Sequence, residues 1–308
     1  MKWIKRIALV LVVLVVVLGV AGAAAWPYLT AREPFPATSS YRIDLDALEA
    51  LAVEGGGALP VAVQHELVAI AGMPRAAIFA GESFDDHPMG HGAYRIVYAD
   101  GSAVVVDAVF SEADMNEMPG EGRFDARAFD KLKETMLEAD AVVLTHEHFD
   151  HIAGIGQIDD FEALAPRLVM NSAQLSSDEA HQFMSDELRA AVEPRDYEET
   201  MQLTPGVVLL RAPGHTAGSQ IIYVKPAEGK ALLLIGDVAW HLDQIRKEHY
   251  RPRLVTDLML GEDREAVLNQ MRALSDLLDS DRVAVVSSHD LDDRRRLIDA
   301  GVLEDGFR

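Results

Sequence analysis

The chain has 308 residues, 49% of them hydrophobic, a formal net charge of -22 at pH 7 and no cysteine. Its length and apolar content allow one large or two small domains with a sizeable core, whereas its negative charge disfavours nucleic acid as a partner, because that binding needs Lys and Arg to neutralise phosphates. Without cysteine, disulfides and metal sites with thiolate ligands are excluded.

The N-terminal segment is predicted to be a separate module, residues 1–30. Met1–Arg6 is basic, and Ile7–Ala25 is an uncharged apolar run of about the length that crosses a bilayer. Trp26 and Tyr28 follow where interfacial aromatic residues are expected. We interpret the segment as an uncleaved transmembrane signal anchor. A removed signal peptide stays open as an alternative, because the small residues Ala21–Ala25 suit a signal peptidase.

The charges around this apolar run predict its orientation. Lys2, Lys5 and Arg6 precede the run and only Arg32 follows closely, so the positive-inside rule places the N-terminus in the cytoplasm. The rest of the chain is then extracytoplasmic, either periplasmic or extracellular. Residues 31–40, with two prolines and small polar residues, are predicted to be a linker. The folded domain is expected over residues 41–308.

Within that domain, short apolar strands alternate with helices. Tyr94–Ala99 and Ala103–Val109 are expected to form a hairpin about Asp100-Gly101. Asp263–Leu278 is predicted to be a helix, because its apolar residues recur on one face. The other expected elements are a helix at Phe129–Ala139 and strands at Ala141–Thr145, Leu168–Asn171, Val207–Arg211, Ile221–Val224, Ala231–Ile235 and Val283–Ser287. This pattern favours an α+β fold in which helices cover sheets.

The most informative stretch follows the apolar run Ala141–Thr145. Four metal-capable side chains lie there within six residues, namely His146, His148, Asp150 and His151. Imidazole nitrogens and carboxylate oxygens suit zinc and similar cations. His146 and His148 alternate and so point to one side, whereas Asp150 and His151 follow where the chain turns and suit a second cation. A His-rich surface turn is the alternative, and the preceding buried-strand pattern disfavours it.

Three later segments each place a potential ligand where an apolar strand gives way to a turn. They contain His215, Asp237 and His289. Taken singly, each is weak, because Asp237 also suits an ordinary turn and His289 a strand end bonded to backbone. Pro and Gly beside His215 favour a backbone shaped to aim its imidazole.

Together the four motifs resemble those of the metallo-β-lactamase superfamily, whose ligand order is His-x-His-x-Asp-His, a later His, an Asp after a strand and a last His. The resemblance implies a four-layer αβ/βα sandwich with the metal site along one edge of two central sheets. It also implies a role for each ligand. His146, His148 and His215 would hold one metal, Asp150, His151 and His289 a second, and Asp237 would bridge both. Two zinc ions are expected, with iron or manganese compatible with the same ligands.

Further details resemble the N-acyl homoserine lactonase-like branch of that superfamily. Phe149 lies inside the His-rich motif, and the final ligand is followed by Asp290. The branch usually carries a Tyr three residues after the bridging Asp, where this chain has Trp240. An indole donates a hydrogen bond but cannot exchange a proton as a phenol does. Trp240 and His241 are expected to border a small-molecule substrate, because Asp237 tethers them near the metals.

The implied function is a membrane-anchored dinuclear metallohydrolase of a lactone or ester. Two adjacent cations lower the pKa of a water between them, so that a bridging hydroxide attacks the carbonyl, and one cation stabilises the oxyanion. Asp150 is the candidate for passing a proton to the leaving group. A role for Asp150 as a ligand alone is equally open.

The same ligand set is compatible with two other enzyme classes, a glyoxalase-II-like thioesterase and a mononuclear iron sulfur dioxygenase. The first is disfavoured because no basic cluster suited to glutathione is evident. A non-catalytic metal-binding module is disfavoured because seven ligands shared by two cations leave coordination positions open. The lack of cysteine disfavours the broad-spectrum β-lactamases, which use Cys on the second metal, and the net charge weighs against the nucleases.

The remaining histidines are given less weight. His65, His181 and His249 are assigned ordinary surface or structural roles. His87 and His91 lie in Asp85–Gly92, which is predicted to be a loop before the hairpin. A position at the border of the site stays open for them as the less favoured alternative.

Overall fold

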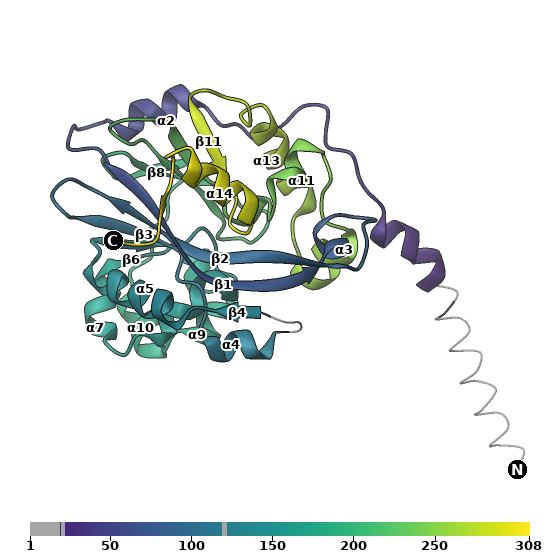
Figure 1. Ribbon diagram of the computed structural model, residues 1–308, viewed down its shortest axis with the longest axis horizontal. Helices are drawn as coiled ribbons and strands as arrows, with labels where there is room; N and C mark the ends of the chain where they lie inside the picture. The colour runs from purple at the N-terminus through teal and green to yellow at the C-terminus, as the bar shows by residue number, and fades with distance from the viewer. Residues whose placement is uncertain (1–18, 20–21, 119–121) are drawn as a thin grey trace, which may run out of the picture.

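Two β-sheets lie face to face at the centre of the molecule (Figure 1). The computed structural model describes residue 19 and residues 22–118 and 122–308. The first sheet has the strand order β12-β1-β2-β3-β5-β6, with β4 paired to β1, and the second has the order β11-β10-β9-β8-β7. The strands of the first sheet are β1 (Ala62–Pro74), β2 (Asp86–Val97), β3 (Ala103–Val106), β4 (Gly122–Phe124), β5 (Ala141–Val143), β6 (Leu168–Val169) and β12 (Glu304–Asp305). Those of the second sheet are β7 (Thr200–Thr204), β8 (Val207–Arg211), β9 (Gln220–Val224), β10 (Ala231–Leu234) and β11 (Val283–Val286).

The central strands are buried on both faces. In β3, Val104 and Val106 lie in the core between the sheets, whereas Val105 lies in the core under the helices. In β8, Val207 and Leu209 likewise face the other sheet. Because successive side chains of a strand point to opposite faces, a strand covered on both sides reads as a continuous apolar run. The uninterrupted apolar stretches in the sequence therefore reflect the layered fold.

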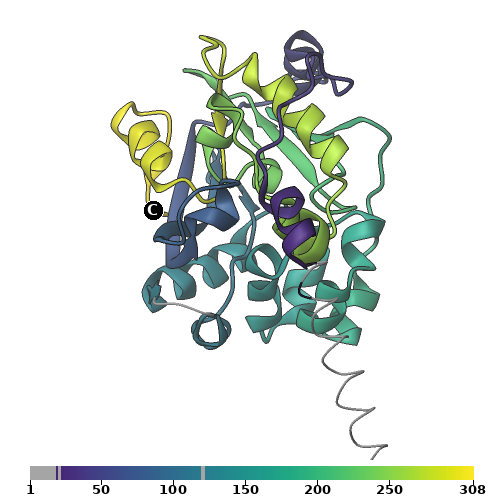
Figure 2. The ribbon, with the colours of Figure 1, turned by 90° about the vertical axis from the view of Figure 1, so that its right-hand side faces the viewer.

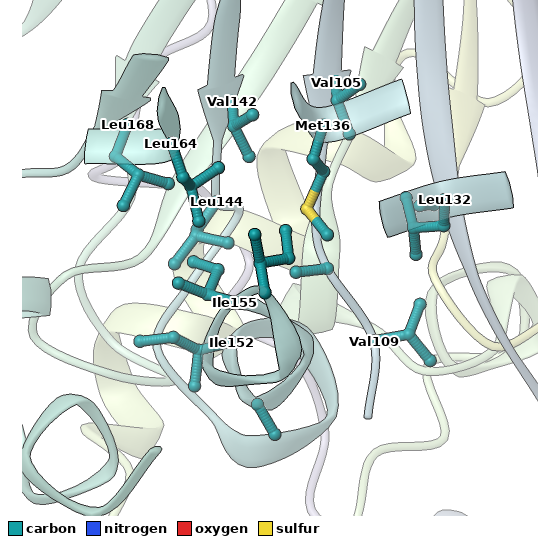
Figure 3. Close-up of a cluster of buried hydrophobic side chains, with 14 of the residues drawn as sticks. Val105, Val109, Leu132, Met136, Val142, Leu144, Ile152, Ile155, Leu164 and Leu168 are labelled. Atoms are coloured by element: carbon teal, nitrogen blue, oxygen red, sulfur yellow. The ribbon is translucent and has the colours of Figure 1, made fainter. Parts of the chain in front are cut away.

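Helices cover the outer face of each sheet, and Figure 2 shows the four layers from the side. Leu132 and Met136 of α5 pack on Val142 and Leu144 below the first sheet (Figure 3). The helices in this layer are α5 (Ala126–Glu138), α6 (Phe149–Ile152), η1 (Ala153–Gln157), α7 (Phe161–Leu164), η2 (Ala165–Arg167), α9 (Asp178–Phe183) and α10 (Asp186–Ala191). The second sheet is covered by α2 (Leu45–Ala52), α11 (Leu242–Arg246) and α13 (Arg264–Ser275). The predicted αβ/βα sandwich is thus confirmed.

Further helices connect these layers and flank the sheets. Their bounds are α3 (Arg75–Ile78), α4 (Glu112–Glu117), α8 (Ser172–Leu175), η3 (Gly236–Val238), α12 (Arg253–Val255), η4 (Thr256–Leu260) and α14 (Leu291–Asp299).

Capping residues set the ends of the predicted helices. The Asp125 carboxylate accepts hydrogen bonds from the backbone N–H groups of Arg127 and Ala128, so α5 begins three residues before the predicted start at Phe129. Asp263 caps α13 by accepting from the backbone N–H of Ala266, and the part of the predicted apolar stripe within the helix is buried. The helix ends at Ser275, three residues before the predicted end at Leu278.

The predicted hairpin is present, but both of its strands differ in extent. β2 and β3 pair antiparallel, with Val97 opposite Ala103, and Gly101 takes the positive φ of 92° that the turn requires. The prediction of a loop over Asp85–Gly92 is wrong, because residues from Asp86 on belong to β2 and pair with the long strand β1. The predicted strand to Val109 ends at Val106.

The strand predicted at Leu168–Asn171 is also shorter than expected. The predicted strand Leu168–Asn171 ends at Val169, because the Asn171 side chain caps α8.

The N-terminal region contributes one described helix, at residues 22–30, and then an extended segment. Within that segment, the predicted linker 31–40, Phe35 is buried in the core beneath α13. The expected membrane span falls mostly on residues 1–18, 20 and 21, which lie outside the described residues. Among the residues described, no helix is long and apolar enough to cross a bilayer.

Candidate metal centre

Seven side chains meet where strands of both sheets end. They come from the loop after β5, from α6, from the β8–β9 connection, from η3 after β10 and from the residue before the N-cap of α14. They form two groups that share Asp237, and within each group the ligand atoms lie within 4.8 Å of one another. One group adds His146, His148 and His215, and the other adds Asp150, His151 and His289. The structure therefore brings together all seven residues that the sequence predicted as ligands.

Asp237 lies between the two groups. Its Oδ2 is 3.7 Å from Nε2 of His146 and 3.4 Å from Nε2 of His215. Its Oδ1 is 3.5 Å from Nε2 of His151 and 3.0 Å from Nε2 of His289. Each carboxylate oxygen thus faces a different pair of imidazoles, which is the arrangement that a bridging carboxylate needs.

The donor atoms fit a pair of cations. Nε2 of His146, His151 and His215 and Oδ1 of Asp237 are buried, and none of them has a hydrogen-bond partner in the described part of the chain. Buried polar groups without partners are costly, and native proteins seldom keep them. Four such atoms converging on one place are explained by cations that they coordinate, with the nitrogen and oxygen ligands that zinc takes.

Three imidazoles are held so that Nε2 faces the site. The Nδ1–H of His151 donates to Oδ2 of Asp107 at 2.9 Å, and that of His215 to Oε1 of Glu262 at 2.6 Å. The Nδ1–H of His289 donates to the Gly90 carbonyl at 2.8 Å. These bonds place the proton on Nδ1 and leave the Nε2 lone pair for a metal.

Asp107 is positioned by an unusual backbone at the end of β3. Its φ is 66°, and its carboxylate also accepts hydrogen bonds from the backbone N–H and the hydroxyl of Thr145. Thr145 in turn lies against Gly236, where a Cβ atom would come within 2.8 Å of the Thr145 side chain. The left-handed turn at Asp107 therefore ends the strand and directs the carboxylate to His151, and such uncommon backbone is found at functional sites.

Glu262 and Arg251 support the first group. The Glu262 carboxylate holds His215, accepts a hydrogen bond from the Tyr250 hydroxyl at 2.5 Å and forms an ion pair with Nη2 of Arg251 at 3.0 Å. Arg251 is fully buried and also donates to the Asp237 carbonyl at 2.9 Å. One guanidinium thus ties two ligand-bearing segments together. No sequence motif indicated Glu262 or Arg251, because both lie in an irregular stretch.

Glu147, inside the His-rich motif, orients the loop that carries His215. Its carboxylate accepts from the backbone N–H of Gly218 at 3.0 Å and from the Thr216 hydroxyl at 2.7 Å. Burial raises the pKa of Glu147, although these bonds oppose the shift. Glu147 therefore links two ligand-bearing loops and is not itself in either ligand group.

Asp150 lies beside His91, whose Nδ1 is 3.2 Å from Oδ2 of Asp150. His91 is buried, and its ring lies edge-on to that of Phe110 and tilted against that of His289. His91 therefore borders the site, which the sequence left as the less favoured alternative, and it lies on β2 and not in a loop. His87 lies farther along β2, with its ring 5.4 Å from that of His241.

Trp240 contacts a ligand instead of an open surface. It is 6% exposed, and its Nε1–H donates to Oδ2 of Asp237 at 2.6 Å. The Arg251 guanidinium stacks on its ring at 4.4 Å. Since an indole has a single donor, Trp240 has none left for a substrate. Nδ1 of His241 accepts from the Asp243 backbone and lies 3.2 Å from Oδ2 of Asp290.

The electrostatics of the cluster favour positive charge. Burial, followed by the neighbouring His215, lowers the pKa of His148 to about 4, so this imidazole is neutral at pH 7. Burial also lowers the pKa of His151, but the carboxylates around it, Asp107 first, outweigh burial and raise it overall. The pKa of His289 rises for the same reason, chiefly through Asp237. The carboxylates thus attract a positive charge that either protons or cations supply.

Comparisons with known proteins agree with this geometry. The profile of the family described as the Metallo-beta-lactamase superfamily matches residues 89–289. An N-acyl homoserine lactonase from Bacillus sp is 26% identical over 154 residues, which is 50% of this chain and 57% of that protein. One from Bacillus cereus is 24% identical over the same shares. The chain thus spans little more than half the length of the curated relatives it matches.

Solved structures show the same fold. A quorum-quenching N-acyl homoserine lactone lactonase superposes with a TM-score of 0.60 and 16% identity, covering 77% of this chain and 95% of that one. An N-acyl homoserine lactone hydrolase with the product N-hexanoyl-L-homoserine at its catalytic metal center gives 0.60 and 15%, with 77% and 96% covered. A probable metal-dependent hydrolase from Staphylococcus aureus gives 0.57 and 14%, with 76% and 91% covered. At these identities the likeness establishes the fold.

Proposed function

Because the chain belongs to the metallo-beta-lactamase superfamily, we propose that it is a dinuclear metal-dependent hydrolase that opens a lactone or ester bond. The observation that carries this proposal is the position of Asp237, with one carboxylate oxygen toward each group of imidazoles. Zinc is the proposed metal, and iron and manganese suit the same ligands.

Two cations bound there would acidify a water and polarise a carbonyl oxygen. The chain's own part is to fix the ligands and to move a proton. Burial raises the pKa of Asp150, but His151 and then His91 outweigh it, so this carboxylate is ionised at pH 7. An ionised Asp150 can accept a proton and later release it to the leaving alkoxide. We propose that His91 holds Asp150 in place for this transfer.

The lactone or ester assignment rests on similarity as well as on the site. The matched curated relatives are named N-acyl homoserine lactonases, and similar solved structures hold lactonase products. Trp240 stands where the branch usually has a tyrosine, and its N–H is bonded to Asp237. Trp240 therefore donates no hydrogen bond to a substrate carbonyl, and a bound cation would be the group that polarises that carbonyl.

We also propose that residues 1–30 anchor the enzyme in a membrane, with the catalytic domain periplasmic or extracellular. The support is the uncharged run Ile7–Ala25 behind a basic N-terminus. Trp26 and Tyr28, 50% and 60% exposed, suit the interface beyond that run. Carbonate washing of membranes should leave the full-length chain in the pellet, and its release would refute the anchor.

The metal and the substrate can be tested on one preparation of the full-length chain. Elemental analysis should give two metals per chain, and turnover should be found with lactones or aryl esters in a panel that also holds thioesters, phosphodiesters and a β-lactam. Asp237→Asn and His148→Ala should lower metal content and abolish turnover. His181→Ala, an exposed histidine on α9, is the matched control and should change neither.

Each other outcome points to a different protein. One iron per chain indicates a sulfur dioxygenase, and turnover of thioesters alone indicates a glyoxalase-II-like enzyme. Two metals without turnover of any panel member indicate a non-catalytic module. Inert lactones and esters beside an active third class would overturn the assigned bond.

A further inference from the structure

We infer that Glu33, in the segment between the N-terminal helix and the folded domain, is a positioning residue for the metal centre. It acts through a chain of contacts that begins at this partly exposed carboxylate and ends at the buried His215. The inference rests on the proposed function, because it concerns the affinity of the first ligand group for its metal.

The chain of contacts begins at the Glu33 carboxylate. Arg264 donates to it through Nε at 2.8 Å, and Arg253 through Nη2 at 2.8 and 3.1 Å. Nη1 of Arg264 then donates to the Arg251 carbonyl at 2.9 Å and to the Thr256 hydroxyl at 3.0 Å. Glu33 therefore fixes the guanidinium that holds the backbone of Arg251.

The next contacts reach the ligand. The guanidinium groups of Arg264 and Arg251 lie 4.7 and 4.9 Å from the ring centre of Tyr250. The hydroxyl of Tyr250 donates to Glu262 and Nη2 of Arg251 forms an ion pair with it, and Glu262 in turn holds Nδ1 of His215. Two contacts thus separate Arg264 from the carboxylate that orients the ligand.

Charge balance explains why the chain needs Glu33. Arg251 and Arg264 are 0% and 6% exposed, so two positive charges are buried side by side. Glu262 compensates Arg251. Among the described residues, the ion pairs give Arg264 no carboxylate other than Glu33. Leaving a buried charge unpaired is strongly unfavourable, and without Glu33 the Arg264 guanidinium would compete with Arg251 for Glu262.

The segment is also held firmly enough to deliver this carboxylate. Phe35 is buried against the core under α13, and the Ser39 hydroxyl donates to the Asn269 carbonyl of that helix at 2.7 Å. Figure 2 shows the segment in purple, running down the molecule between α2 and the helix at residues 22–30. A fragment that begins at Tyr41 would lack both anchors.

The test compares full-length variants that affect the same segment differently. Glu33→Gln removes the charge and keeps the shape, whereas Phe35→Ala removes a buried apolar side chain that has no part in the chain of contacts. Co2+ binding is followed by competition with a chromophoric chelator and by the d–d absorption spectrum, at a temperature well below the melting transition of every variant. Glu33→Asp, which keeps the charge, serves as the conservative rescue.

Glu33→Gln should weaken one of the two Co2+ sites about three- to tenfold and change its spectrum. This loss is smaller than the loss of about ten- to hundredfold for removing a direct partner of a ligand, as in Glu262→Gln. Phe35→Ala should lower the melting temperature but leave Co2+ affinity and spectrum as in the wild type. Equal Co2+ affinity in Glu33→Gln and wild type overturns the inference, and so does an equal loss in Phe35→Ala. A wild-type chain that binds no Co2+ refutes the proposed function itself.

Discussion

Asp107→Asn is the sharpest test of how the second ligand group works. The Asp107 carboxylate is 1% exposed and accepts from Nδ1–H of His151 at 2.9 Å and from the Thr145 backbone N–H at 2.7 Å. Asn tolerates the left-handed φ of 66° as Asp does, so the substitution does not strain the backbone. Its amide oxygen can still accept from Thr145. Its NH2 group then faces Nδ1 of His151, which must shed its proton to accept.

The substitution therefore moves the His151 proton to Nε2, the atom that faces the metal. The lost interaction is a hydrogen bond to a charged group, worth about 1.5–3 kcal/mol. At about 1.4 kcal/mol per tenfold, this corresponds to a loss of about ten- to hundredfold in affinity at the second site, in the range known for partners of metal ligands.

Zn2+ titration against a competing chelator measures this directly. The wild type should show two sites, and Asp107→Asn should keep one close to wild-type affinity and weaken the other by the stated factor. Two unchanged sites would contradict the role given to Asp107. Equal weakening of both sites would show that the two ligand groups do not act separately.

Three further predictions concern other parts of the structure. Trp240→Phe keeps an aromatic ring but removes the donor to Asp237, so steady-state kinetics should show kcat reduced about tenfold or more and KM little changed. Burial, aided by Arg294, lowers the pKa of His65 to about 3. Since the unfolded state, with a pKa near 6.5, then binds the extra proton, His65 should contribute a loss of about 2 kcal/mol of stability between pH 8 and pH 5. Urea unfolding at both pH values should show a loss in the wild type that exceeds the loss in His65→Gln by this amount. Leu132→Ala, at a 0% exposed position under the first sheet, should cost about 2–5 kcal/mol in the same assay while leaving Zn2+ stoichiometry at two.

The metal ligands were predictable because each lies next to a local pattern. His146 to His151 follow a buried strand, and Asp237 and His289 follow two others. The groups that orient these ligands come from distant segments and have no such context. Glu262 reaches His215 from 47 residues away, through an irregular turn that no periodicity marks. Asp107 is an exception, because it also follows an apolar strand and that signal was available.

The first half of the long strand β2 escaped prediction for a different reason. Its first half is rich in Gly, Pro and His, a composition typical of a loop. Gly92 is there because β1 approaches closely, and a Cβ atom at this position would lie 2.4 Å from the Glu66 carbonyl oxygen. Pairing along β1 therefore outweighs local propensity. Gly90, in the same stretch, provides the carbonyl that fixes His289. Gly92 thus allows the close packing of β1 on β2, and Gly90 orients a metal ligand, although both glycines are typical of turns.

The position of Trp240 limits where substrate selectivity can arise. Its only donor is bonded to Asp237, and Arg251 covers its ring, so residue 240 acts on the bridging carboxylate. His148 and Asp150, each only partly buried, are the ligands that solvent reaches. A substrate is then expected to approach from their side, next to Phe149, which is also partly buried and stacks on Phe110. Discrimination among esters and lactones should therefore respond to substitutions at Phe149 and His91 more than to changes at Trp240, which affect every substrate through the metals.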